Sequence, residues 1–301
     1  MAITLSTENI DDNGKELLHY GTKEFPIAFF DDDLTKVKVP WHWHEEFEIC
    51  ILLEGKVDFR VANQSMRLKA QEGYFINSGI LHSEKLLSPS GHQHCLIFSP
   101  TLISPVHDLI WQTYIEPLLN NPQIPFIHLQ PSVPWQKDIL DIAKKAWEIG
   151  AYDQKDFPYH VRESLSKIFV EFVNHRDILD HAYHYTIKNY QDELRVKTKL
   201  RFIETHYAEK ITIAHIAKSA DISISTCLRL YKSILHTTPI HYLIQYRLQK
   251  SLELLKGSKM SISEIAFACG FNDPSYYNKW FKKEYRITPS TYILNLHQNN
   301  E

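Results

Sequence analysis

Three histidines and one glutamate form the pattern in this sequence with the clearest capacity for chemistry. His42, His44 and Glu48 follow one another at even spacings, and His82 comes later in the same region. Imidazole and carboxylate groups bind Zn, Ni, Fe or Mn, and they also exchange hydrogen bonds with hydroxyl groups. A regular strand would direct His42, His44 and Glu48 to one face. The pattern therefore predicts a site for a metal ion or a polar effector on a β-sheet.

The residues around this pattern favour short strands. Residues 37–99 contain runs of β-branched and aromatic residues separated by turn-forming sequences at 54–56, 62–64 and 71–73. Strands at a spacing of about 8–12 residues are typical of a sandwich or a barrel. We expect an all-β region that presents the histidines from its strands.

Two segments in this region resemble the paired motifs of the cupin family. They are HWHEEFEICILLEG at residues 42–55 and GYFINSGILH at residues 73–82. The second departs from the family pattern at Asn77, where proline is usual, and in the shorter distance from Gly73 to Asn77. The resemblance implies a cupin-like barrel, and it implies that the positions of His42, His44, Glu48 and His82 supply ligands to a divalent metal.

Three interpretations of this cluster stay open at this point. The four side chains hydrogen-bond a polar effector, or they bind a divalent metal, or they form a satisfied polar cluster with a structural role. We favour the effector, which requires no cofactor. Trp41 and Trp43, which flank His42, would stack on a sugar ring or pack in the core.

The next part of the chain has helical periodicity. Apolar residues recur at helical spacing over residues 139–147 and again over 161–172, after Pro158. The two amphipathic helices pack on the β region of the same chain or pair with a second copy. Residues 176–192 have weaker periodicity, and we expect them to form a linker.

The charge is divided unevenly along the chain. Residues 1–194 carry 17 Lys and Arg against 28 Asp and Glu, whereas residues 195–301 carry 16 against 8. An acidic first part joined to a basic second part suggests that the second part binds a polyanion.

The basic part contains an internal repeat. Residues 213–222 match residues 262–271 at an offset of 49, and residues 231–242 match 281–292 at an offset of 50. Each copy has the pattern of a helix-turn-helix unit, with Asp221 or Gly270 at the turn, where a left-handed residue is needed. Ser223 in the first copy, and Asn272 or Asp273 in the second, would cap the second helix. We expect Leu228, together with Leu230 and Tyr231, to be buried in the first copy.

The opposite face of each second helix carries residue types that contact bases and phosphates. We predict that the DNA-contacting residues are Ser225, Thr226, Arg229, Lys232, Ser275, Tyr276, Asn278, Lys279 and Lys282.

Residues 194–295 resemble the DNA-binding domain of the AraC/XylS family of bacterial transcription regulators. The second copy, SISEIAFACGFNDPSYYNKWFKKEYRITPSTY, follows the family signature closely, and the first departs from it at Asp221, where glycine is usual. The resemblance implies a regulator that binds promoter half-sites in double-stranded DNA and acts as a homodimer. It also implies a small effector, with a sugar as the favoured class, and RNA polymerase as a further partner if the regulator is an activator.

We therefore predict an α+β protein with two domains. A cupin-like sensor barrel occupies residues 15–110, and a helical dimerisation and linker segment occupies 111–185. An all-α DNA-binding domain at 190–295 has helix-turn-helix units at 211–235 and 261–285, joined by a helix at 238–256. A connecting helix of this kind would hold two recognition helices about one turn of DNA apart, ~34 Å.

Other function classes find less support. The N-terminus lacks the pattern of a signal peptide, no apolar run is long enough to span a membrane, and the four cysteines are far apart, so we expect a reduced, cytoplasmic protein without a disulfide framework. Nucleophile-elbow, Walker and dinucleotide-binding motifs are missing, so we do not expect an enzyme. The alternatives are a metal-dependent cupin enzyme with a DNA-binding tail, and a regulator without a small-molecule effector.

Overall fold

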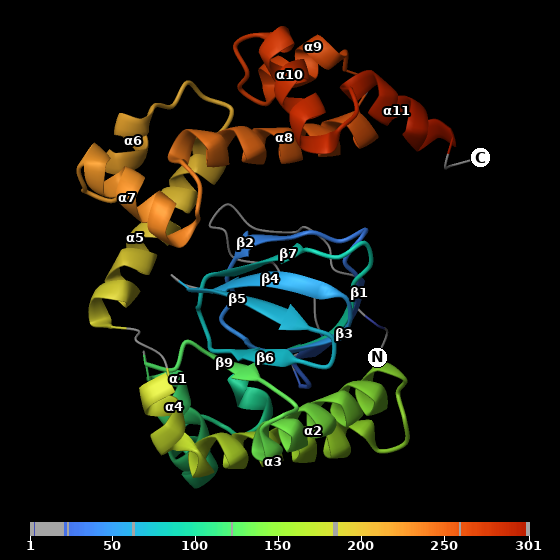
Figure 1. Cartoon of the computed structure of the whole chain (residues 1–301), viewed down its shortest axis with the longest axis vertical. Helices are drawn as coiled ribbons and strands as arrows, with labels where there is room; N and C mark the ends of the chain where they lie inside the picture. Colours follow the sequence, from blue (N-terminus) through green and yellow to red (C-terminus); the bar gives the residue numbers. More distant parts are fainter. Residues whose placement is uncertain are drawn as a thin grey trace. The chain divides into compact units, whose positions relative to one another are not determined.

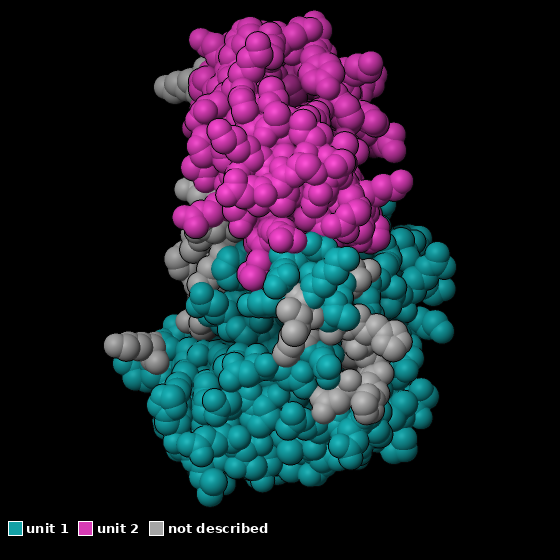
Figure 2. All heavy atoms as spheres, turned by 90° about the vertical axis from the view of Figure 1, so that its left-hand side faces the viewer, with its two compact units in different colours: residues 1–193 teal, residues 194–301 magenta. Residues whose placement is uncertain are grey.

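The chain divides into two compact units, Met1–Glu193 and Leu194–Glu301 (Figure 2). The computed structural model describes residues 3, 21–22, 24–61, 64–121, 123–182, 186–258 and 260–298. The predicted start of the sensor domain at residues 15–20 lies outside the described residues. In the described part of the chain, the first unit holds the strands and the second is helical.

The first unit is built around two antiparallel sheets (Figure 1). One sheet has the strand order β1-β8-β3-β6-β9 and the other has the order β2-β7-β4-β5. The strands are β1 (Ile27–Asp33), β2 (Val39–His42), β3 (Phe47–Glu54), β4 (Lys56–Val61), β5 (Gln64–Lys69), β6 (Gly73–Ile76), β7 (His82–Leu86), β8 (His92–Phe98) and β9 (Phe126–Leu129). The predicted β-rich sensor domain is confirmed.

A core of apolar side chains lies between the two sheets. β4 shows why, because Val57, Phe59 and Val61 are buried while the residues between them are not. Phe59 stacks on Tyr74 of the other sheet, with ring centroids 4.2 Å apart. Side chains from the two sheets therefore pack against one another in a single core.

Two strands lie outside the segment for which strands were predicted. β1 precedes it, and β9 pairs with β6 inside residues 111–185, which were expected to be helical. With four residues, β9 is too short to give a readable period. Its partner β6 decides its structure, and sequence periodicity does not report such a distant pairing.

Two long helices cover the other face of the five-stranded sheet. They are α2 (Pro134–Ala151) and α3 (Phe157–Asn174), as the periodicity predicted. Phe169 of α3 packs against Phe47 of β3 and Phe75 of β6, with ring centroids 5.1 and 5.8 Å apart. The apolar stripes of both helices thus belong to the core of their own chain. The shorter elements nearby are η1 (Pro100–Leu102), η2 (Trp111–Ile115) and α1 (Glu116–Leu119).

The segment expected to be a linker contains helical residues. α4 (Arg176–Ala182) and the start of α5 (Ile187–His206) fall within residues 176–192, so the described part of the predicted linker is largely helical. After residue 192, α5 buries Val196, Leu200 and Ile203, which recur at helical spacing. The first turns of α5, inside the predicted linker, continue this helix toward the N-terminus.

The second unit contains two helix-turn-helix units joined by a long helix. The remaining helices are α6 (Ile213–Lys218), α7 (Ile224–Ile234), α8 (Pro239–Gly257), α9 (Ile262–Ala268), α10 (Pro274–Tyr285) and α11 (Pro289–Gln298). α8 runs between the two pairs, α6 with α7 and α9 with α10 (Figure 1). Every helix among the described residues is too short or too polar to cross a membrane.

The turn and cap residues of this unit are ones that the sequence analysis named. Asp221 and Gly270 adopt positive φ values of 51° and 80° at the two turns. Ser223 accepts a hydrogen bond from the Thr226 backbone at 3.2 Å, and Asp273 caps α10 through the Ser275 backbone at 2.8 Å. These side chains satisfy N–H groups that a helix start leaves unpaired, so both second helices begin at defined residues.

Replacement of Gly270 by alanine should destabilise the second unit. A Cβ atom there would lie 2.5 Å from the backbone oxygen of Tyr207, and the positive φ adds strain. We expect the Gly270→Ala variant to lose about 1–3 kcal/mol of unfolding free energy. A Cβ at Gly257 would meet nothing within 4 Å, so Gly257→Ala is the matched control. Hydrogen exchange of peptides from residues 210–285 measures the difference, and equal protection of the two variants would contradict this account.

Candidate metal centre and nucleic-acid interface

The four predicted site residues of the first unit converge, although they do not share one strand. His42 ends β2, His44 lies in the connection that follows, and Glu48 lies in β3. The prediction of one regular strand is wrong, because the chain leaves one sheet after His42 and enters the other at β3. His82 begins β7, which pairs with β2 opposite His42. Their four ligand atoms all lie within 4.8 Å of one another.

The backbone sets the direction of each imidazole. Nδ1 of His42 lies 2.9 Å from the Pro40 carbonyl oxygen. His44 and His82 make the equivalent contacts with the carbonyl oxygens of Glu46 and Ile80, at 3.1 and 2.8 Å. A carbonyl oxygen only accepts hydrogen bonds, so Nδ1 carries the hydrogen in all three rings. In a neutral ring, Nε2 then presents a lone pair.

The Nε2 atoms of His44 and His82 lie beside a buried acidic group. Nε2 of His44 and of His82 lie 3.2 and 3.1 Å from Oε2 of Glu48. All four side chains are at most 7% exposed. Burial lowers the pKa of His42 and His82 to about 4, with help from the neighbouring imidazoles, so both are neutral at pH 7. The His82 Nε2 atom is buried without a hydrogen-bond partner.

Such an arrangement fits a divalent cation. A cation would replace the hydrogens between the imidazoles and Glu48 and would be bound by lone pairs of the rings and of the carboxylate. Histidines that bind metals usually donate their second ring N–H to a carbonyl or carboxylate, as these three do. The hydroxyl of Tyr74 donates to Oε1 of Glu48 at 3.2 Å, which fixes the carboxylate. Three nitrogens and one oxygen suit Zn, Ni, Fe or Mn.

The cluster fits a sugar less well. Ring centroids of His42, His44 and His82 lie 4.1–5.8 Å from one another, so the rings themselves fill the space around the ligand atoms. A single ion fits among four ligand atoms within 4.8 Å of one another. The geometry therefore favours the metal over the direct binding of an organic effector by these four groups.

One cysteine pair departs from the expectation of no disulfide framework. Cys50 of β3 and Cys95 of β8 are joined by a disulfide. The antiparallel register places them directly opposite, with Cα atoms 4.1 Å apart, a relation that residue spacing does not reveal. Both are buried, and their sulfur atoms lie close to Glu48.

The predicted DNA-contacting residues lie on the outer faces of α7 and α10. Thr226 is half-buried, and its hydroxyl accepts a hydrogen bond from Ser223 at 3.0 Å. The others are exposed: Ser225, Arg229, Lys232, Ser275, Tyr276, Asn278, Lys279 and Lys282. Both helices bury the opposite face, with Tyr231 and Phe281 fully buried at equivalent positions. Each second helix thus presents to the solvent a polar surface that includes two basic residues.

Leu228 differs from its prediction. It was expected in the core, but it is 40% exposed, and Ile224 one turn before it is 44% exposed. The buried positions of α7 are Cys227, Leu230, Tyr231 and Ile234, which leaves Leu228 beside the polar face. Apolar side chains contact the methyl group of thymine, and sequence reasoning missed this pair because it placed Leu228 in the core and did not consider Ile224.

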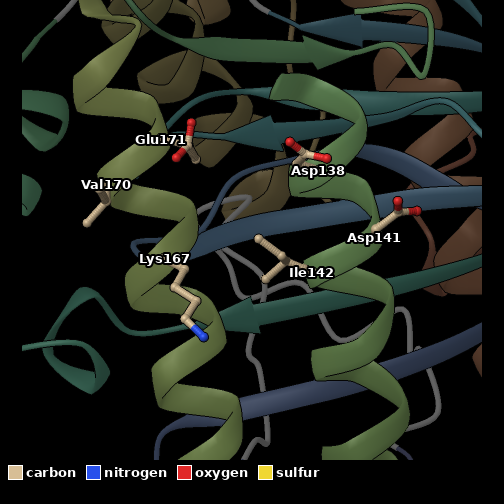
Figure 3. A pocket seen from close by; sticks show the side chains of 6 residues that line it. All are labelled: Asp138, Asp141, Ile142, Lys167, Val170 and Glu171. Carbon is tan, nitrogen blue, oxygen red and sulfur yellow. The ribbon is translucent and has the colours of Figure 1, made fainter. Parts of the chain in front are cut away.

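A groove lies between α2 and α3 (Figure 3). Ile142 and Val170 contribute apolar surface to it, and its other lining residues are charged: Asp138, Asp141, Lys167 and Glu171. This groove, rather than the apolar stripes packed in the core, is the part of the two helices available to a second copy.

Acidification should destabilise the first unit. The pKa of His42 and His82 in the folded chain is about 4, below the ordinary value of 6.5. Between these values the two imidazoles bind more protons in the unfolded chain, so their contribution to the unfolding free energy falls as pH drops from 6.5 to 4, by up to ~1.4 kcal/mol per pH unit for each. Thermal melting in EDTA at constant ionic strength measures this. His82→Asn should show a shallower dependence, and an unchanged slope would show that His82 is not buried and neutral.

Comparisons with known proteins agree with this two-unit organisation. Residues 24–125 match the AraC-like ligand binding domain, and residues 216–295 match a helix-turn-helix domain. In solved structures, the chain resembles fatty-acid-bound ToxT from Vibrio cholerae with a TM-score of 0.43 and 16% identity, covering 92% of this chain and 97% of that one.

Two curated relatives carry more sequence similarity. The chain is 30% identical over 287 residues to the uncharacterized HTH-type transcriptional regulator YdeC of Bacillus subtilis, covering 94% of this chain and 97% of that protein. It is 32% identical over 95 residues to the HTH-type transcriptional activator RhaS of Escherichia coli, which is 32% of this chain and 34% of RhaS. The chain belongs to the AraC family of DNA-binding transcriptional regulators, with a ligand-binding domain followed by a helix-turn-helix domain.

Proposed function

We propose that this regulator responds to a divalent cation held by His42, His44, Glu48 and His82. The observation that carries the proposal is the convergence of three Nε2 atoms and one carboxylate in a buried site, with each Nδ1 engaged by a backbone carbonyl. This replaces direct binding of an organic effector by the four groups. The ligand-binding domain thereby senses the availability of the cation.

Cation binding changes DNA binding only if it distinguishes two states of the regulator. The ion must bind the DNA-competent arrangement more tightly, or less tightly, than the other one. Its four ligands come from β2, the connection after it, β3 and β7, which belong to both sheets. An ion that draws them together would favour one arrangement of the two sheets, and this supplies the required difference in affinity.

We further propose that α7 and α10 enter successive major grooves on one side of the DNA. α8 has 19 residues and is about 28 Å long, close to the ~34 Å of one DNA turn. Arg229 and Lys279 read base edges, whereas Lys232 and Lys282 contact phosphates. Ile224 and Leu228 add apolar contacts from α7.

A homodimer is the assembly that we propose, with the groove between α2 and α3 as its contact. Ile142 and Val170 would meet the second copy, and Lys167 would face acids on the partner's α2. If the regulator activates transcription, as RhaS does by name, RNA polymerase is a further partner. A sugar effector and carbohydrate target genes stay predictions, because the similarity to RhaS covers about a third of that protein.

Removal of the metal should change operator affinity. DNA selected from a random pool by the full chain in the presence of Zn²⁺ supplies the operator, and fluorescence anisotropy measures its Kd with Zn²⁺ or with EDTA. Coupling of 1–3 kcal/mol corresponds to a change of about 5–150-fold. His82→Asn should abolish the difference, while His128→Asn, which alters a separate pair with Glu72, should preserve it. Equal Kd values with and without Zn²⁺ in the wild-type chain would refute metal control.

The two classes of DNA contact should separate in mutants. Arg229→Ala should cost ~1–3 kcal/mol on the selected operator and relax specificity at one position. Lys282→Ala should weaken binding to all sequences alike and reduce the slope of log Kd against log salt by about 1. Competition with operators altered at single positions measures both effects. Uniform weakening by Arg229→Ala would reassign that residue to phosphate.

A further inference from the structure

A second group of metal-binding side chains lies on strands β1 and β8. It consists of Asp31, His92 and His94, and their ligand atoms lie within 4.8 Å of one another. The antiparallel register places Asp31 opposite His94, and His92 follows two residues away on the same face of β8. The group is therefore produced by strand pairing, not by closeness in sequence.

This group is separate from the buried cluster. Along β1, Phe29 belongs to the core beneath α2 and α3, whereas Phe30 belongs to the core between the sheets. Asp31 has the parity of Phe29, so it faces the helical side. Glu48 has the parity of Cys50, which packs between the sheets. The two groups thus lie on opposite faces of the five-stranded sheet.

The ligand atoms converge on one carboxylate oxygen. Nε2 of His94 lies 3.3 Å from Oδ1 of Asp31, and Nε2 of His92 contacts the same oxygen. Exposed fractions of the side chains are 33% for Asp31, 43% for His92 and 15% for His94. The group is open enough for an ion to enter and for water to complete its coordination.

The helical layer holds His94 in place. Its ring stacks on Trp147 of α2, with centroids 3.4 Å apart and an interplanar angle of 9°. Trp147 itself is buried and donates a hydrogen bond to the Phe30 carbonyl oxygen at 3.0 Å. A fixed ring loses little freedom when it binds an ion.

We propose that Asp31, His92 and His94 bind a second divalent cation on the face of the five-stranded sheet that α2 and α3 cover. We call this position the outer site. Two imidazoles and one carboxylate suit Zn, Ni or Co, with water in the remaining positions. The positive charge of Lys144 on α2 acts on His94 and opposes the ion. The outer site therefore fills at higher metal concentration than the buried site, which has four protein ligands.

The number of ions bound by the full chain tests this proposal. Equilibrium dialysis against Zn²⁺, followed by elemental analysis, should give two ions per wild-type chain and one for Asp31→Asn. His92→Asn should give the same loss, and it serves if Asp31→Asn fails to fold. His128→Asn is the matched control, because it removes a histidine paired with one carboxylate, and it should keep both ions.

The outcomes distinguish this site from the buried one. If Asp31→Asn and His92→Asn bind as many ions per chain as the wild type, the proposal is overturned, and the result for His82→Asn does not alter this conclusion. If His82→Asn binds as many ions per chain as the wild type while the outer-site variants lose one ion, the outer site is supported and the buried metal site is refuted. Binding to Co²⁺ gives a second readout, because the outer-site variants should lose part of the visible absorption and His128→Asn should not.

Discussion

The convergence of three imidazoles and one carboxylate in a buried site is the constraint around which the first unit is organised. His42, His44 and His82 each hold a hydrogen on the nitrogen that faces the backbone, and the opposite nitrogens converge near Glu48. Burial makes this costly, because water does not reach the site to compensate. A divalent cation would compensate the buried carboxylate, and no rearrangement of the ligands' backbone partners would be needed.

The surrounding layers maintain that arrangement. The core between the sheets fixes β3 and β7, while the core beneath α2 and α3 fixes the far side of the five-stranded sheet. Because α2 and α3 use their apolar stripes in this second core, the proposed contact with a second copy uses their outer groove. The same layer holds His94 against Trp147, which places the proposed outer ion between the sheet and the helices.

The extent to which the sequence predicted this structure differs between the two units. Helix-turn-helix units are local, and turn and cap residues such as Asp221, Ser223 and Gly270 reveal them directly. The cluster was recognised by residue type, but its geometry was not, since His42 and Glu48 belong to different sheets. Pairing between distant strands decides the features that were missed: β9, the Cys50–Cys95 disulfide and the group around Asp31. Leu228 was misassigned because periodicity locates a core face only to within about one residue.

Anomalous diffraction tests the central claim most directly. Crystals of the full chain grown with Zn²⁺ would be measured on both sides of the zinc absorption edge. The account predicts an anomalous peak about 2.0–2.2 Å from the Nε2 atoms of His42, His44 and His82 and from a carboxylate oxygen of Glu48. Density for an organic molecule, or no anomalous peak among these four residues at saturating Zn²⁺, would contradict it.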